Sequence, residues 1–255
     1  MSAKSVKSGV PAFIRHWDAH QRYQHLLLFV SMFFLFLTGF PIKWGHMDWA
    51  KSVVALFGGF NNMLNVHLVA AVVMIFAGLY HIVWLVLHFT FTGPQWSMVP
   101  TKQDALNAFH HAKYLLGITK EPPKYDRYTY LEKFEYLAGG YGIILMGLTG
   151  FFLWFPEIAA AVMPRWVIHL LRIAHSNEAV VCLIAVSIGH FFWVHFHPDV
   201  FPTSKVWING KISRHHEMEE HPLEYERLVT QYGGEENVER NILPIILARD
   251  GGIWV

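Results

Sequence analysis

Histidine is the residue type whose number and placement in this chain suggest chemistry. The sequence holds 17 histidines, and several of them lie within long apolar runs. A polar, ionisable side chain at membrane depth is costly, so such residues usually mark a functional site, as metal ligands or proton carriers. The histidines inside apolar runs are His25, His67, His81, His88, His175 and His190.

The apolar runs are long enough to cross a lipid bilayer. No Asp, Glu, Lys or Arg occurs between Lys51 and Lys102 or between Glu135 and Glu157, and about 20 apolar residues suffice for a helical span. With 53% hydrophobic and only 15% charged residues, the composition predicts a membrane protein. We expect an all-α transmembrane four-helix bundle with spans at about 24–44, 63–91, 134–155 and 167–197.

Polar segments flank the expected bundle. Residues 1–23 precede the four-helix domain of residues 24–197, and a polar tail of residues 198–255 follows it. Four spans place both ends of the chain on one side of the membrane, with the loop after the second span. That side carries sixteen Lys and Arg residues against four on the other, which predicts cytoplasmic N and C termini. The stretch HHEMEEHPLEYERL in the tail is compatible with either a short helix or an extended arm.

The direction of each helix sets the depth of its histidines. The first span rises from the inner face and places His25 near that face, whereas the second descends and places His67 near the outer face. In the fourth span, which also descends, His175 lies near the outer face and His190 near the inner one. These two are separated by about 22 Å along the helix and lie within roughly 60° of one face. One helix can therefore supply a ligand to each of two stacked centres.

Two histidines from different helices in each layer favour a haem with two histidine ligands, because both axial positions are then filled. Cys182 is the only cysteine and there is no C-x-x-C-H motif, so covalently attached haem is excluded. Zinc or copper would need three or four clustered ligands. Histidines that only hydrogen-bond between helices are the structural alternative.

Other residues of the chain have plainer expected roles. The third span has no histidine but five glycines, which allow close helix packing or leave room for a flat macrocycle. The histidines in expected loops and tails are predicted to be solvated: His16, His20, His46, His110, His111, His215, His216 and His221.

Four segments, in their order, resemble the dihaem cytochrome b subunits of formate dehydrogenases, nickel-iron hydrogenases and thiosulfate reductases. They are HQRYQHLLLFVSMFFLFLTG, NVHLVAAVVMIFAGLYH, KFEYLAGGYGIILMGLTGFFLWF and IAHSNEAVVCLIAVSIGHFFWVHFH. The tail from HPDVFPTSKVWINGKI onward resembles cytochromes b encoded beside multihaem cytochromes c. The resemblance implies two haem b groups, one held by His25 and His190 and the other by His67 and His175.

The spacing leaves a second candidate for the inner layer. His67 and His81 lie on one expected helix about 40° from alignment, which resembles ligation in the cytochrome b of bc complexes and would pair His81 with His190. The R-Y-Q-H-L setting of His25 at a helix start matches the four-helix family and favours His25. His81 and His88 then become candidates for an inner-side quinone or proton site.

Two arginines lie close in sequence to the expected ligands. Arg22 and Arg172 are candidates to pair with haem propionates, and ordinary anchoring at the membrane interface is the alternative.

The chain contains no flavin, nucleotide or iron-sulfur motif, so a complete enzyme is not expected. The resemblance implies an electron-transfer subunit between membrane quinone (menaquinone or ubiquinone) and an iron-sulfur or multihaem cytochrome c subunit. It would lie in the inner (cytoplasmic) membrane of a bacterium or archaeon, with no nucleic-acid partner. A stand-alone small cytochrome b quinol oxidoreductase remains open. A histidine-rich metal-ion transporter is disfavoured, because Glu178 is the single charge between Arg172 and Asp199.

Overall fold

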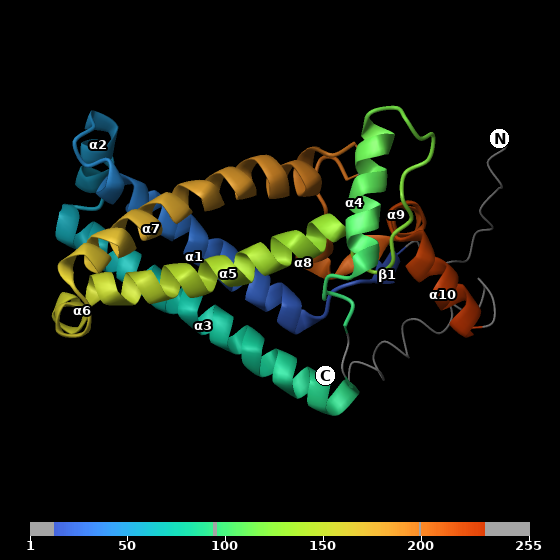
Figure 1. The fold of residues 1–255 in the computed structure, drawn as a ribbon, viewed down its shortest axis with the longest axis horizontal. Helices are drawn as coiled ribbons and strands as arrows, with labels where there is room; N and C mark the ends of the chain where they lie inside the picture. The colour runs from blue at the N-terminus through green and yellow to red at the C-terminus, as the bar shows by residue number, and fades with distance from the viewer. Residues whose placement is uncertain (1–12, 94–95, 199, 233–255) are drawn as a thin grey trace. The chain divides into compact units, whose positions relative to one another are not determined.

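The computed structural model describes residues 13–93, 96–198 and 200–232, and most of these residues are helical (Figure 1). The parts of the expected N-terminal segment before residue 13 and of the expected tail after residue 232 lie outside the described residues. The elements in chain order are β1 (Phe13–Arg15), α1 (Ala19–Lys43), α2 (Asp48–Leu56), α3 (Phe60–Thr92), α4 (Lys102–Leu115), α5 (Tyr130–Trp154), α6 (Pro156–Val162), α7 (Arg165–Ile184), η1 (Ala185–His190), η2 (Phe192–Phe196), α8 (Val206–Asn209), β2 (Lys211–Ser213), α9 (Arg214–Glu220) and α10 (Pro222–Tyr232).

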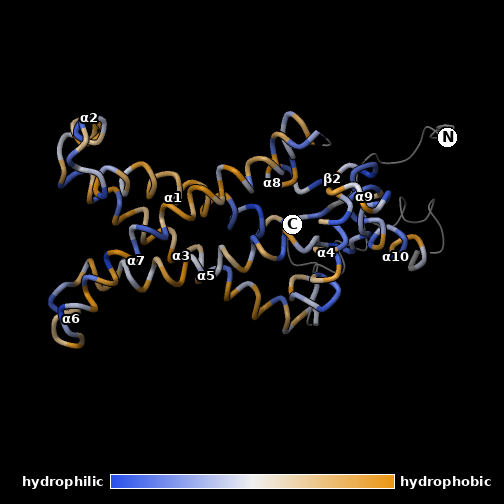
Figure 2. The backbone as a smooth tube through the Cα atoms, turned by 45° about the horizontal axis from the view of Figure 1, so that its top comes forward, coloured by the Kyte–Doolittle hydropathy of each residue, from blue (hydrophilic) through white to orange (hydrophobic). Residues whose placement is uncertain are grey.

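Four helices are long and apolar enough to cross a membrane, which confirms that part of the prediction. They are α1, α3, α5 and the helix that runs from Arg165 to Phe196, and apolar residues predominate along them in Figure 2. Helix α1 begins earlier than expected because Asp18 and Gln21 cap it. The Gln21 backbone N–H donates to the Asp18 carboxylate at 2.7 Å, and the Asp18 N–H donates to the Gln21 side chain at 2.9 Å. Such a reciprocal cap stabilises a helix start outside the apolar run.

The fourth long helix is not α-helical throughout. Its last turns, η1 and η2, are π-helical. A π-helix has i→i+5 hydrogen bonds and therefore more residues per turn, so each residue rotates less about the axis than in an α-helix. The sequence estimate of about 60° between His175 and His190 assumed a uniform α-helix. The wider turns therefore change the direction of His190 about the helix axis from that estimate.

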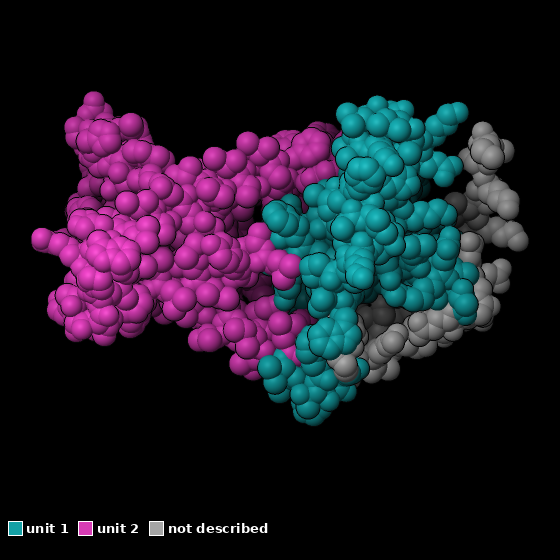
Figure 3. Space-filling model, viewed as in Figure 1, with its two compact units in different colours: residues 1–22, 86–136, 204–255 teal, residues 23–85, 137–203 magenta. Residues whose placement is uncertain are grey.

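The chain divides into two compact units (Figure 3): residues 1–22, 86–136 and 204–255 form unit 1, and residues 23–85 and 137–203 form unit 2. Unit 2 holds most of each of the four long helices, which are linked by side-chain contacts. Thr38 of α1 contacts His67 of α3, and Thr149 of α5 contacts His175 of α7. Lys43 joins α1 to α7 through Ser176, 3.0 Å away.

Small and polar side chains fill the inside of unit 2. The buried positions include Ser31, Thr38, Ala70 and Ala77, and a side chain added at Gly78 of α3 would lie 3.3 Å from Ile143 of α5. Small residues let helices approach closely where lipid, not water, surrounds the bundle. Many large apolar side chains are exposed instead, among them Phe29, Val69, Phe76, Ile144 and Leu148.

Unit 1 holds the only strands among the described residues, an antiparallel pair that was not predicted from the sequence. Ile14 of β1 lies opposite Ile212 of β2. Ile212 and Tyr225 form a small apolar core, against which Val206, Leu228 and Val229 pack. Gly210, at φ 72°, precedes β2 in the left-handed region. A side chain there would collide with the Trp17 carbonyl, so glycine is required by both conformation and space.

An ion pair joins helix α4 to the start of α5 within unit 1. Asp104 and Thr101 form a capping box at the start of α4, and Lys133 donates to both Asp104 carboxylate oxygens at 2.9 and 3.0 Å. Burial by itself would raise the pKa of Asp104. The hydrogen bonds from Lys133 and Thr101 outweigh it and lower the pKa below its ordinary value of 3.8.

Replacing Asp104 with Asn should destabilise α4 by about 1–3 kcal/mol, between the values typical of exposed and buried ion pairs. Because the folded pKa is lowered, the contribution is full above the unfolded value of 3.8 and is lost as pH falls through the lower folded value. Amide hydrogen exchange of α4 measures both effects. Asp48→Asn is the control, because Asp48 pairs with Lys51 in an exposed i,i+3 ion pair. Equal exchange in the two variants would contradict the assignment.

Candidate functional site

The inner pair of expected ligands lies together in unit 2. His25 is in the first turns of α1 and His190 ends η1, and their ring centroids are 6.2 Å apart with planes at 43°. Two imidazole nitrogens that both bond one iron atom at about 2 Å hold their ring centroids roughly 6–6.5 Å apart. The spacing of this pair therefore fits an iron atom between the two rings.

The second pair, His67 and His175, has matched partners on the neighbouring helices. The two imidazoles are close enough to interact electrostatically. Thr38 Oγ1 lies 2.9 Å from His67 Nδ1, and Thr149 Oγ1 lies 2.8 Å from His175 Nδ1. Each ring is thus held from one side by a threonine of an adjacent helix.

These threonines define which ring nitrogen carries the proton. Thr38 donates its hydroxyl hydrogen to the Phe34 carbonyl at 2.6 Å, and Thr149 donates to the Leu145 carbonyl at 2.7 Å. A hydroxyl has one hydrogen, so toward the histidine each oxygen must accept, and Nδ1–H must donate. The lone pair then lies on Nε2, the nitrogen available to a metal, in the arrangement by which second-shell groups orient metal-binding histidines.

A glycine follows each of these threonines and faces the same ring. A side chain at Gly39 would lie 3.3 Å from His67 Cε1, and one at Gly150 would lie 3.1 Å from His175 Cε1. The sequence signal for these threonine and glycine contacts with His67 and His175 is a repeated tetrapeptide, Leu-Thr-Gly-Phe, at 37–40 and 148–151. The sequence analysis missed this repeat, although it noted glycines in the third span.

His81, the alternative inner ligand, lies in a different setting. Its Nδ1 is 2.9 Å from Gln24 Oε1, and its ring stacks on Trp84 with 6.0 Å between centroids. His190 is the ring paired with His25, as described above. Within α3, His88 accepts a hydrogen bond at its carbonyl from the Thr92 hydroxyl at 2.7 Å.

The two arginines differ in their surroundings. Arg22 donates to the backbone carbonyls of Asp18, at 3.3 Å, and Ile208, at 2.8 Å, both within unit 1. Arg172 is exposed on α7. Near the outer pair, Lys43 reaches Ser176 at 3.0 Å and Asn177 at 2.8 Å, directly after His175. Lys43 is therefore a cation close to that pair that the sequence analysis did not single out.

The expectation of solvated loop histidines is wrong for His16 and His221, which are 7% and 3% exposed. The described part of the tail folds as α9 and α10 against the segment after β1. His221 Nδ1 lies 2.7 Å from the Asp126 carbonyl. Burial lowers the pKa of His16 well below its ordinary value of 6.5, and Arg127 and His221 lower it further. His16 is consequently neutral at physiological pH.

The comparison with protein families decides the identity of this histidine-paired bundle. The family model for prokaryotic cytochrome b561 matches residues 16–205. The chain belongs to the prokaryotic cytochrome b561 family. A comparison with curated proteins finds no match. Family membership and the four apolar helices make this cytochrome a multi-pass prokaryotic membrane protein of electron transfer, with b-type haem bound by histidines.

In this cytochrome, Thr38→Val should weaken haem binding at the His67–His175 pair by roughly 10- to 100-fold, the usual effect of losing a second-shell partner. Valine matches the shape of threonine but leaves Nδ1–H of His67 without its acceptor. A less basic imidazole donates less electron density, so the midpoint potential of that haem should rise. Thr149→Val should act in the same way through His175. Haem titration and potentiometry measure the two effects.

Thr90→Val is the control for both threonine variants. Thr90 is exposed on α3 and bonds only to the Val86 carbonyl of its own helix among the contacts described. Unchanged haem affinity and unchanged potential in Thr38→Val and Thr149→Val would rule out the positioning role.

Gly150→Ala in the same cytochrome should reduce haem occupancy at the His175 side. The added methyl group would press on a ring that Thr149 already holds, so the ring can move only by straining that hydrogen bond. Gly140→Ala is the matched control, because a side chain at Gly140 meets nothing within 4 Å. Absorbance in the Soret region per chain measures occupancy, and equal values in the two variants would contradict the argument.

Proposed function

We propose that the chain is a dihaem b-type cytochrome, with His25 and His190 binding one haem and His67 and His175 binding the other. The observation that carries this is the pairing itself. Four histidines on three helices form two pairs inside one bundle, and the Nδ1 atoms of one pair are both anchored by threonine. Two histidines per site with no thiolate or carboxylate fit haem iron better than zinc or copper.

When bound, a haem with two histidine ligands supplies reversible one-electron transfer between ferric and ferrous iron. The residues of the chain do the rest. Two histidines would hold each haem iron and would leave no position on it open to oxygen. Thr38 and Thr149 hold the outer rings in one tautomer, and the small residues inside the bundle leave room beside them. The apolar surroundings lower the local dielectric, which tunes the potential.

The inner ligand is assigned to His25 rather than His81. The 6.2 Å spacing of the His25 and His190 rings supports this choice. His81, with Gln24 at 2.9 Å, instead offers a polar group near the inner end of the bundle. Nδ1–H of His81 donates to Gln24 Oε1, so Nε2 can take up a proton and, once protonated, can donate to a quinone carbonyl. His81 and His88 are proposed for this proton-transfer role.

The proposed electron path links membrane quinone, menaquinone or ubiquinone, to an iron-sulfur or multihaem cytochrome c subunit. The charge bias of the sequence supports cytoplasmic N and C termini in a bacterial or archaeal inner membrane. The β1–β2 pairing supports placing both chain ends on one side, because four spans separate the two strands. Arg22 and Arg172 are proposed to lie near the haem propionates, together with Lys43.

A pyridine haemochrome assay on purified protein tests the cofactor count. The expected result is two haem b per chain, with a low-spin spectrum in both redox states. One haem or fewer per chain would sink the dihaem proposal.

Single alanine variants test the ligand set. His25→Ala, His67→Ala, His175→Ala and His190→Ala should each lose one low-spin haem, because an axial position is left open. His46→Ala is the matched control, since His46 is exposed in the loop after α1, and it should retain both haems. If His81→Ala loses a haem while His25→Ala keeps both, the inner pair is His81 with His190.

A further inference from the structure

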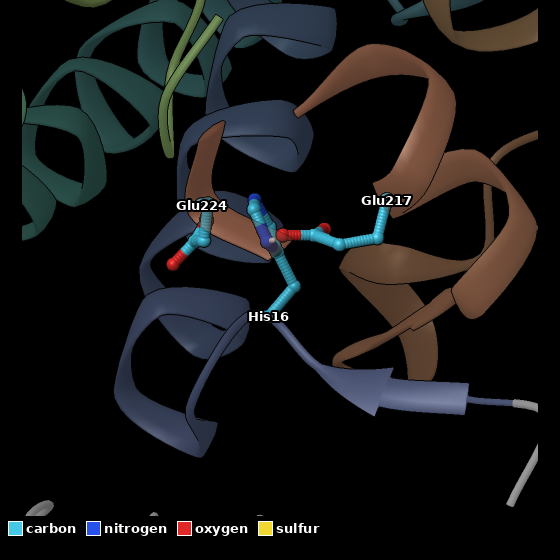
Figure 4. A group of neighbouring side chains, drawn as sticks. All are labelled: His16, Glu217 and Glu224. Atoms are coloured by element: carbon cyan, nitrogen blue, oxygen red, sulfur yellow. Dashed lines mark ion pairs between the residues drawn. The ribbon is translucent and has the colours of Figure 1, made fainter. Parts of the chain in front are cut away.

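A buried polar cluster lies in unit 1, apart from the histidine pairs of the bundle (Figure 4). It consists of His16, just after β1, Glu217 of α9 and Glu224 of α10, which are 7%, 1% and 3% exposed. Their ligand atoms all lie within 4.8 Å of one another. In Figure 4 the His16 side chain projects between the two carboxyl groups. Nothing in the proposed electron transfer uses these residues.

The hydrogen bonding of this cluster is incomplete. Among the described residues, Oε2 of Glu217 and Oε2 of Glu224 are buried and have no hydrogen-bond partner. His16 Nδ1 lies 4.0 Å from the nearer oxygen of Glu217, too far for a hydrogen bond. Buried acceptors without partners are rare in native proteins, and each needs an explanation such as a bound ion or water.

The negative charges of the two carboxylates are also not balanced by the positive charges beside them. Arg127 donates to Glu224 Oε1 at 3.0 Å and to the His16 carbonyl at 3.0 Å. Arg227 is half exposed and lies closer to Asp126, at 2.9 Å, than to Glu224, at 3.6 Å. Two buried carboxylates therefore face one buried guanidinium. The remaining negative charge must be neutralised by a proton or by a cation.

The types of ligand atom in the cluster, one nitrogen and two carboxylate oxygens, favour a cation that binds both nitrogen and oxygen ligands. Without a cation, burial and the neighbouring Glu224 raise the pKa of Glu217 to about 9, so this carboxyl would hold a proton that a metal ion must displace. A proton shared between the two orphaned oxygens would leave the His16 nitrogen unused, whereas a metal ion would engage all three groups. One imidazole and two carboxylates resemble three-ligand transition-metal sites, which complete their coordination with water. Metal bonds of about 2 Å hold ligand atoms roughly 3–4 Å apart, so the three groups need to close only slightly.

We propose that His16, Glu217 and Glu224 form a binding site for one divalent transition-metal ion of the zinc type. The three ligands come from the segment before α1, from α9 and from α10. A bound ion would join the segment before the first long helix to the folded tail. Its role would be structural, because it would add a direct link between the segment before α1 and helices α9 and α10.

Zinc binding to the full-length, haem-loaded protein tests the site. After treatment with a chelator, the protein is titrated with Zn²⁺ alone, and elemental analysis reports zinc separately from haem iron. The expected result is one tightly bound zinc per chain. X-ray absorption at the zinc edge should show one imidazole ligand with oxygen ligands otherwise.

Glu217→Gln and His16→Gln should each bind zinc at least about 100-fold more weakly, because loss of a ligand exceeds the usual effect of losing a second-shell group. Glutamine resembles a protonated glutamate in shape, so Glu217→Gln should keep the fold and both haem signals. Glu219→Gln is the matched control on the same helix. Glu219 is exposed and pairs with exposed His215, so it also reports zinc bound at the surface.

The outcomes separate a metal site from a buried proton. Zinc bound by the wild type and by Glu219→Gln, but by neither His16→Gln nor Glu217→Gln, supports the proposal. No zinc in the wild type, or equal zinc in the wild type and the two ligand variants, overturns it and leaves a shared proton as the counter-charge. Neither result depends on the haem count, so this test and that of the electron-transfer function can fail separately.

Discussion

The cost of placing imidazoles inside an apolar bundle governs the architecture of this protein. A polar group without a partner in a low-dielectric interior costs several kcal/mol on transfer scales, so a histidine at that depth must be hydrogen-bonded, bound to a metal, or both. Thr38 and Thr149 satisfy one nitrogen of His67 and His175. The other nitrogen is left for a ligand, so the same bond that removes a penalty also prepares a coordination site.

The rest of unit 2 follows from this constraint. Helices that hold a flat cofactor cannot fill their interior with large side chains, and the buried positions of the bundle are accordingly small or polar, such as Ser31 and Ala77. The large apolar residues face outward, where lipid replaces water and their exposure carries no penalty. The π-helical turns at the end of the fourth long helix change the direction of His190 without adding a loop, as π-bulges at functional sites commonly do.

The sequence predicted the four long helices and the four histidines because both depend on rules of composition and depth. A run without charges must be a span, and a polar residue within it must have a purpose. The threonines were not predicted, because a threonine in an apolar helix ordinarily bonds to its own backbone and gives no sign of a second partner. The buried His16 was not predicted either. Its neighbours Glu217 and Glu224 are about 200 residues away in the chain, and only the folded tail brings them together.

The pairing of β1 with β2 has a consequence for biosynthesis. Ile14 is synthesised before the four long helices, whereas its partner Ile212 is made roughly 200 residues later, after all of them. Contacts of such high sequence separation form late, because the entropy of closing the loop must be overcome first. Unit 1 can therefore be completed only in chains whose helices have all been synthesised. A truncated or stalled chain would leave the early strand with an unpaired edge, which quality-control proteases and chaperones could recognise.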